Sequence, residues 1–203
     1  MRAIRVGAAR FVLLVLFLPL LAGCYLPDQF VAEIRLGGNG TYAITYQGIL
    51  TWVPLLADIK RNKLPPGEAR KKVAEIEKDL RRDENFKEIT SLGSGQFRVR
   101  YERFGRLKET EMVTFIRRNA VLITMTSSKD GTVKIAGTSM PKNEGGEVRE
   151  LGLNMEGSFR VVTGATVLKH NAGRIEQNGP FQTYFWQINS TNRQPPKIVI
   201  QLH

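Results

Sequence analysis

The sequence predicts an α+β domain built on a largely antiparallel β-sheet, curved or partly closed, with one main amphipathic helix inserted after the first hairpin. Three observations predict this fold class. A glycine-rich turn separates two strand-like segments, one clear helical period follows, and the chain after residue 86 consists mostly of short segments with strand-like patterns. Consecutive strands joined by short turns pair antiparallel, so we expect the helix to lie across one side of the sheet.

The first predicted element is a hairpin. Phe30–Leu36 predicts a strand, residues 37–40 (Gly-Gly-Asn-Gly) predict a turn, and Thr41–Val53 predicts the returning strand. One face of the returning strand carries Tyr42, Ile44 and Tyr46. The glycines could also suggest a phosphate-binding loop. No Lys-Ser/Thr pair and no helical pattern follow them directly, so a hairpin turn is the better interpretation.

Two helices are expected after this hairpin. Pro54–Asn62 predicts a short helix, and Pro65–Asp83 predicts a longer one with proline in its first turn. Spacings of four, three and four residues place a narrow apolar stripe on the longer helix, made of Ala69, Val73, Ile76 and Leu80. A helix that lies on lipid needs a wider apolar face, so we expect this stripe to pack on the sheet.

The remaining chain predicts strands. The clearest is Gln96–Phe104, in which Phe97, Val99 and Tyr101 alternate with charged residues. The other predicted strands are Phe86–Leu92, Glu111–Arg117, Ala120–Thr126, Thr132–Ser139, Gly157–Thr163, Ala165–His170, Gln182–Ile188 and Lys197–Leu202, with Glu147–Asn154 as an edge strand. We expect Ala165–His170 to pair with the strand before it, after a turn at Gly164.

The N-terminal segment predicts an export signal. Its first ten residues carry three arginines and no acid, and the 12-residue apolar run Phe11–Ala22 is too short to span a bilayer. The segment closes with Leu-Ala-Gly-Cys, of which Cys24 is the only cysteine in the chain. This ending resembles the lipobox of bacterial lipoproteins, which implies acylation of the Cys24 sulfur, for example with palmitate, and cleavage before it. The alternatives are an ordinary cleaved signal with a chance cysteine and a short uncleaved anchor.

The sequence therefore predicts three segments: a lipoprotein signal peptide (1–23), a lipidated tether (24–29) and a single α+β envelope domain (30–203). We expect the protein to be exported and lipid-anchored to a bacterial membrane. Tyr25 stands where an aspartate would commonly retain a lipoprotein in the inner membrane. Its presence favours the outer membrane, facing the periplasm, in a Gram-negative cell; otherwise the outer face of the cell membrane is expected.

The charge of the mature chain limits its partners. Without the three signal arginines, 27 basic and 19 acidic residues leave a formal charge of +8. Such a domain would be attracted to anionic head groups of the membrane. Nucleic acid is another usual partner of basic domains, but export makes it an unexpected one. A basic surface that is simply solvated is the alternative. A single cysteine allows no disulfide within the chain, so the core must hold the fold.

We find no pattern that predicts catalysis, a metal site or a cofactor. The two histidines, His170 and His203, lack the H-E-x-x-H spacing of a zinc site, and no G-x-S-x-G elbow is present. His170 is expected to cap a strand end by hydrogen bonding. Residues 93–95 (Gly-Ser-Gly) are expected to form a hairpin turn. We therefore expect a protein that is not an enzyme.

One group of aromatic and basic residues is a candidate for ligand binding. Its members lie on predicted strands or close to them: Trp52, Phe97, Tyr101, Phe159, Tyr184, Phe185 and Trp186, with Arg98, Arg100, Arg103, Arg117 and Arg118. Curved sheets with aromatic interiors hold apolar ligands, and a basic rim suits phosphates. Such aromatic residues more often belong simply to the core, and both interpretations stay open at this point.

Several short strings in the mature chain resemble the LppM-type domain of bacterial lipoproteins. They are residues 157–163 (Gly-Ser-Phe-Arg-Val-Val-Thr), residues 170–172 (His-Asn-Ala), Trp186 and the Pro195-Pro196 pair. The resemblance implies an envelope protein with a curved-sheet domain, for which lipid or glycolipid binding has been proposed. Members often add a C-terminal membrane helix, whereas this sequence closes on a predicted strand. Only Cys24 is carried over as a functional position.

The leading hypothesis from the sequence is a non-catalytic, membrane-anchored lipoprotein of the bacterial envelope that binds a lipid or another amphiphile next to the membrane. The alternative is a protein–protein interaction module that assists an envelope complex. In both, the expected partners are membrane lipid through Cys24 and an anionic lipid or an envelope protein.

Overall fold

The computed structural model describes residues 25–117, 120–138, 144–189 and 194–203, which form two β-sheets and three helices. The large sheet has the strand order β10-β11-β8-β1-β2-β4-β3. Its strands are β1 (Tyr25–Leu36), β2 (Thr41–Trp52), β3 (Phe86–Gly93), β4 (Gln96–Arg106), β8 (Gly157–Thr163), β10 (Arg174–Asn178) and β11 (Phe181–Ile188).

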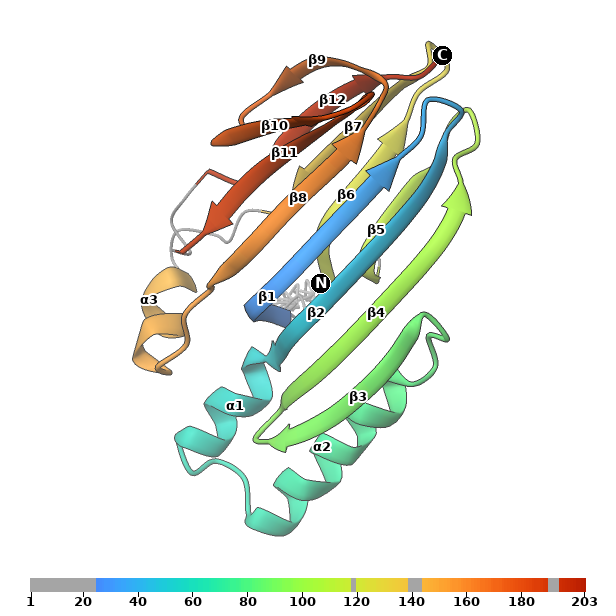
Figure 1. Cartoon of the computed structure of the whole chain (residues 1–203). Coiled ribbons are helices and arrows are strands. Elements are labelled where there is room, and N and C mark those ends of the chain that lie inside the picture. The colour runs from blue at the N-terminus through green and yellow to red at the C-terminus, as the bar shows by residue number, and fades with distance from the viewer. Residues whose placement is uncertain (1–24, 118–119, 139–143, 190–193) are drawn as a thin grey trace, which may run out of the picture.

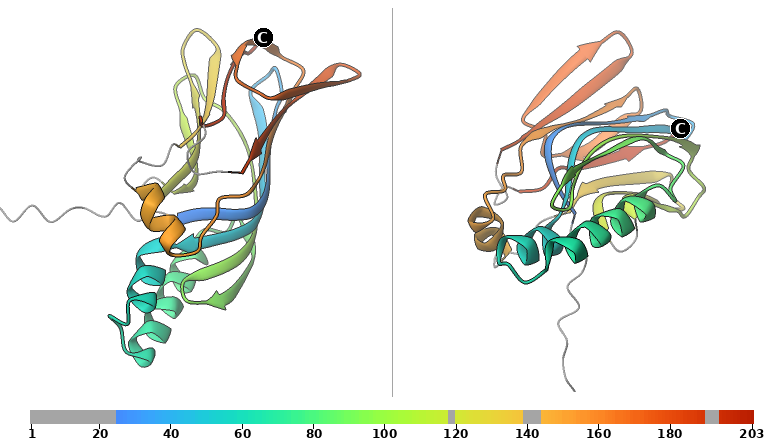
Figure 2. Two further views of the ribbon diagram at one scale, coloured as in Figure 1. Left: turned by 90° about the vertical axis from the view of Figure 1, so that its left-hand side faces the viewer. Right: turned by 90° about the horizontal axis from the view of Figure 1, so that it is seen from below.

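The small sheet has the order β5-β6-β7-β12-β9. Its strands are β5 (Met112–Arg117), β6 (Ala120–Ser127), β7 (Thr132–Gly137), β9 (Thr166–His170) and β12 (Lys197–Gln201). The helices are α1 (Val53–Lys60), α2 (Pro66–Leu80) and α3 (Glu144–Glu150). Figures 1 and 2 show that the small sheet and α1 and α2 lie on the same, concave side of the large sheet. We call that side the inner face and the opposite side the outer face.

The predicted fold class is confirmed. The structure is α+β, and the longest helix, α2, follows the first hairpin after the short helix α1. The strand pairings of the described residues are antiparallel except that of β1 with β8. Two sheets replace the single curved sheet that the sequence suggested. The alternating strands do bury one face each, as the period of two predicted, but they bury it against a second sheet.

Aromatic side chains join the two sheets in the core. Phe115 of β5 lies between two tyrosines of the large sheet, with its ring centroid 4.9 Å from Tyr46 and 4.7 Å from Tyr101. Tyr46 also stacks on Phe30, at 5.6 Å between centroids. All four rings are buried. Their packing holds the small sheet over the middle of the large one, at a geometry in which aromatic pairs add to plain area burial.

The expected tether is wrong for residues 25–29, which form the beginning of β1. Tyr25 and Leu26 are buried, and the strand continues to Leu36 through a bulge between Asp28 and Val31. At the bulge the Asp28 carboxylate accepts hydrogen bonds from the backbone N–H groups of Gln29 (2.9 Å) and Glu156 (3.1 Å). The bulge interrupts the alternation of side chains, which is why this part of the strand had no recognisable pattern.

The edge strand predicted for Glu147–Asn154 is also wrong. Glu144–Glu150 is helical, and the chain turns after it. Val148 and Leu151 are three residues apart and are both buried, with Leu26 and Leu56, in a second hydrophobic cluster. That spacing suits one face of a helix rather than one face of a strand.

The pairing predicted for Ala165–His170 is wrong as well. The segment forms β9, as a strand, but β9 pairs with β12 of the small sheet and not with β8. Thr163 fixes the turn in which the chain leaves β8 for β9. Its hydroxyl donates a hydrogen bond to the Leu36 carbonyl (2.8 Å) and accepts one from the Ala165 N–H (3.1 Å). β10 was missed because all five of its residues are exposed, so no apolar period marks it.

We predict that Gly157→Ala destabilises the fold. Gly157 of β8 pairs with Phe30 of β1, and a Cβ on Gly157 would lie 2.5 Å from the Phe30 carbonyl oxygen. The clash is with backbone in the middle of a sheet, so we expect a loss of about 1–3 kcal/mol in the free energy of unfolding, measured by urea denaturation. The control is Gly67→Ala on α2, where nothing lies within 4 Å; this variant should be neutral or slightly stabilised. Equal stability of the two variants would contradict the prediction.

Candidate functional site

The site is built where the described chain begins. Cys24, the predicted acylation position, lies outside the described residues, and Tyr25 follows it directly. Tyr25 is only 7 % exposed and pairs across the sheet with Trp52, the last residue of β2. The two rings meet edge to face with centroids 4.8 Å apart. The first residue after the predicted anchor is therefore fixed in the core.

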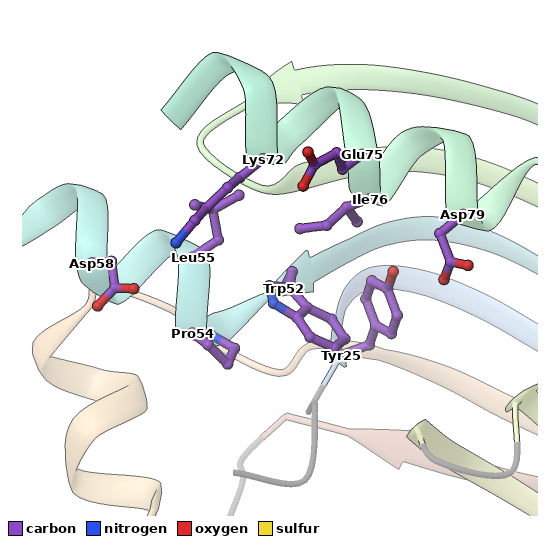
Figure 3. Close-up of a pocket in the computed structure, with 9 residues that line it drawn as sticks. All are labelled: Tyr25, Trp52, Pro54, Leu55, Asp58, Lys72, Glu75, Ile76 and Asp79. Carbon is purple, nitrogen blue, oxygen red and sulfur yellow. The ribbon is translucent and has the colours of Figure 1, made fainter. Parts of the chain in front are cut away.

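A pocket of about 420 Å³ lies beside this aromatic pair (Figure 3). We call it the helix pocket, because α1 and α2 form its walls together with the ends of β1 and β2. Its lining is apolar at Tyr25, Trp52, Pro54, Leu55 and Ile76 and charged at Asp58, Lys72, Glu75 and Asp79. The pocket is an open hollow with an apolar base and a charged rim, the arrangement expected of an amphiphile site.

Loose packing of α2 leaves room for this pocket. Leu80 is the one fully buried residue of α2, and Val73 and Ile76 are half-buried against the main core. Lys72, Glu75, Ile76 and Asp79 follow each other at spacings of three, one and three residues, so all four side chains face the pocket. On the other side, α1 starts immediately after Trp52 with Pro54 in its first turn. This direct continuation of β2 into α1 places Trp52, Leu55 and Asp58 on one wall.

The rim carries more negative than positive charge. Asp58, Glu75 and Asp79 are carboxylates, and Lys72 is the single ammonium of the lining. The exposed Arg82 guanidinium also pairs with Asp79, at 3.3 Å. The pocket itself thus favours a positively charged group of a ligand, although the chain as a whole is basic.

The aromatic group singled out from the sequence is mostly core. Five of its members are buried in the main hydrophobic cluster: Phe97, Tyr101, Phe159, Tyr184 and Trp186. Only Trp52 lines the helix pocket. For the five buried side chains, plain core packing is the better of the two interpretations that the sequence left open.

The structure does not bring the candidate arginines together. Arg98 and Arg100 alternate with the buried residues of β4 and lie on the outer face, where Arg100 pairs with Glu88 and Glu102. Arg103 lies on the inner side, where its positive charge lowers the pKa of the Tyr101 phenol. The side chain of Arg117 and the whole of Arg118 lie outside the described residues. These arginines therefore form no common basic rim among the described residues.

His170 and the Gly-Ser-Gly turn have structural roles. The Nδ1 atom of His170 accepts a hydrogen bond from the Ala172 N–H (3.1 Å), as expected of a residue that caps a strand end, and the ring meets Tyr184 edge to face. Ser94 lies in the turn between β3 and β4 with a positive φ of 52°. Within the described ranges, no group of three His, Cys, Asp or Glu side chains is placed to hold a metal ion.

None of the described helices is both long and apolar enough to cross a membrane.

The chain is similar to a solved structure but to no family model. No protein-family model and no curated protein matches the chain. The NMR structure of the folded domain of LppM from Mycobacterium tuberculosis is similar at 10 % identity and a TM-score of 0.40, over 87 % of this chain and 90 % of that one. Similarity at this level transfers no role or residue to this chain.

Sequence reasoning missed most of the helix pocket. One pattern in the sequence could have indicated it: the apolar Ile76 shares its face of the predicted helix with the charged residues Lys72, Glu75 and Asp79. The contribution of Tyr25 and Trp52 could not be predicted, because it depends on how β1 begins.

We predict an alkaline loss of stability that depends on Tyr101. Burial raises the pKa of the Tyr101 phenol to about 12; the Asp83 carboxylate adds to this effect, and Arg103 opposes it. The unfolded phenol ionises near pH 10, so the stabilisation is complete below pH 10 and is lost as the pH rises through about 12. The loss attributable to Tyr101 is up to about 3 kcal/mol.

The test compares the native chain with Tyr101→Phe in urea denaturation between neutral pH and pH 12. The Tyr101 hydroxyl has no hydrogen-bond partner among the described residues, so the variant should match or exceed native stability at pH 7 and lose less at high pH. Parallel pH profiles for the two proteins would refute the assignment.

Proposed function

We propose that this protein is a non-catalytic lipoprotein of the bacterial envelope, anchored through Cys24, that binds an amphiphile in the helix pocket next to the membrane. The observation that carries the proposal is that Tyr25, the residue after Cys24, is itself a wall of the pocket. Because consecutive Cα atoms are 3.8 Å apart, a lipid attached to Cys24 starts beside the pocket. An anchored chain would therefore hold the pocket at the bilayer surface.

The lining supports an amphiphile rather than a fully polar ligand. Trp52, Leu55 and Ile76 offer apolar contact to a hydrocarbon segment, and the carboxylates of Asp58, Glu75 and Asp79 would attract an ammonium group. Lys72 would pair with a phosphate. A phospholipid with an amine in its head group combines these features.

Exposed cations of the α1–α2 region support contact with anionic lipid. Lys63, Arg70, Lys71 and Lys78 lie on or between the two helices, and no ion pair with a described residue engages them. Each well-placed Lys or Arg contributes about 1 kcal/mol near an anionic bilayer surface. The same proposal includes a location in the envelope, with the outer membrane preferred because Tyr25 follows Cys24. It includes no nucleic-acid partner.

We predict that Cys24→Ala abolishes lipidation. Cells that express the native chain should incorporate an alkyne analogue of palmitate into the protein, and the variant should take up none. The variant should also leave the membrane fraction, since Cys24 is the only cysteine available. An unlabelled native chain would refute the anchor and the localisation together.

We predict that the helix pocket carries a lipid that is separate from the anchor. The acylated protein, released from the envelope in a mild uncharged detergent, should show a bound lipid mass by native mass spectrometry. Ile76→Asn places an amide in the apolar base of the pocket and should lower lipid occupancy about tenfold, since burying an unpaired amide costs roughly 1–3 kcal/mol. The matched control is Ile175→Asn on β10, an exposed site outside the pocket lining, which should keep the lipid.

Native protein without a bound lipid, or equal loss in the two variants, would contradict the proposal. A stoichiometric protein captured in place of the lipid would favour the interaction module instead.

A further inference from the structure

The outer face of the large sheet carries a second hollow, far from the helix pocket. Both helices that flank the helix pocket and the small sheet lie on the inner face, and no other described element covers the outer face (Figure 2). Two adjoining depressions of about 560 and 340 Å³ share Arg35, Val162 and Phe181. We call them together the outer groove. It runs across β1, β8, β11 and the turn before β11.

A buried carboxylate organises the polar wall of this groove. Glu33 of β1 points to the outer face, yet its side chain is only 9 % exposed. Its Oε1 atom accepts a hydrogen bond from Nε of Arg35 (2.5 Å), and its Oε2 atom accepts one from Nε of Arg160 on β8. One carboxylate thus fixes two guanidinium groups side by side.

Arg35 and Arg160 share the single negative charge of Glu33, so this cluster has one excess positive charge. The other carboxylate of the lining, Glu176, pairs with Arg174 at 2.9 Å. Arg35 and Arg160 each bind Glu33 through Nε, and their side chains remain 67 % and 44 % exposed. Glu33 is the only described carboxylate paired with either of them. The other outer-face arginines that form ion pairs do not share a carboxylate: Arg100 pairs with two, and Arg174 pairs with Glu176 alone. The guanidinium edges of Arg35 and Arg160 are therefore suited to bidentate binding of an added anion.

The opposite wall is apolar and aromatic. Phe181 is half exposed, and Val162 and Phe185 are half-buried beside it. Arg174 lies over the Phe185 ring at 4.2 Å and so shields it partly. Thr183 and Asn178 add polar groups to the lining. An apolar group held next to an anion would fit against Phe181.

We propose that the outer groove binds the carboxylate or phosphate of a ligand that also carries an aromatic or aliphatic group. Arg35 and Arg160 bind the anion, Glu33 positions them, and Phe181 contacts the apolar part. Arg35 lies ten residues after Tyr25 on β1, which corresponds to about 30 Å along the strand. The groove is therefore a separate site from the helix pocket, and the proposal does not depend on the function proposed for that pocket.

The test titrates the acylated protein in uncharged detergent with phenyl phosphate and phenylacetate, followed by calorimetry or ligand-observed NMR. We expect saturable binding of one or both acids, and at least tenfold weaker binding of neutral benzyl alcohol. Arg35→Gln and Arg160→Gln should each weaken binding about tenfold or more. The affinity for phenyl phosphate, compared with that for phenylacetate, decides whether the groove prefers a phosphate or a carboxylate.

The matched control is Arg98→Gln. Arg98 is an exposed arginine of the same face, outside the lining of the groove and without an ion pair to a described residue, and its loss should change affinity less than about twofold. We expect the native protein to bind phenyl phosphate more tightly than inorganic phosphate. Phe181→Ala removes an exposed side chain and is expected to fold, and it should abolish this difference in affinity. No saturable binding in the millimolar range, or equal losses in Arg98→Gln and Arg160→Gln, would overturn the proposal.

Discussion

The whole structure depends on the pairing of β1 along both of its edges. β1 lies in the middle of the large sheet, antiparallel to β2 and parallel to β8. The pairing is possible only because glycines flank Phe30 on both sides: a Cβ on Gly48 would lie 2.5 Å from the Phe30 Cβ, and one on Gly157 would meet the Phe30 carbonyl. Phe30 can then stack on Tyr46, and through it contacts the aromatic group that holds the small sheet.

The two candidate sites follow from the same strand. Its first residue, Tyr25, forms a wall of the helix pocket, and Glu33 and Arg35 near its other end form the polar wall of the outer groove. The alternation along β1 sends Ala32 and Ile34 into the core and Glu33 and Arg35 to the outer face. Glu33 stays almost buried there because the two arginines cover it, which satisfies its charge. One strand thus positions an apolar site and an ionic site at its two ends.

The sequence predicted the parts of the fold that have their own periodicity. Gln96–Phe104 alternates because one face of β4 is fully buried, and the stripe ending at Leu80 reports that α2 packs on the sheet. Pairing between strands far apart in the sequence could not be predicted, since no pattern in Gly157–Thr163 indicates that this strand pairs with β1. No pattern predicts β10, because its residues are all exposed, and the sequence predicts a strand at α3 because the buried residues of that helix are few. The helix pocket combines residues from four elements, and the outer groove depends on Glu33 and Arg160, which are 127 positions apart, so neither could be assembled from local patterns.

The parallel β1–β8 pairing has a consequence for the order in which the chain can fold. β1, β2 and β4 are close in sequence and can associate early, whereas β8 arrives more than 120 residues after β1. Until then, the edge of β1 that β8 later covers has unpaired N–H and C=O groups, which can join the edge of another chain. Contacts of such long range slow folding. A chain that is synthesised from its N-terminus therefore exposes this edge of β1 until the second half of the domain is available.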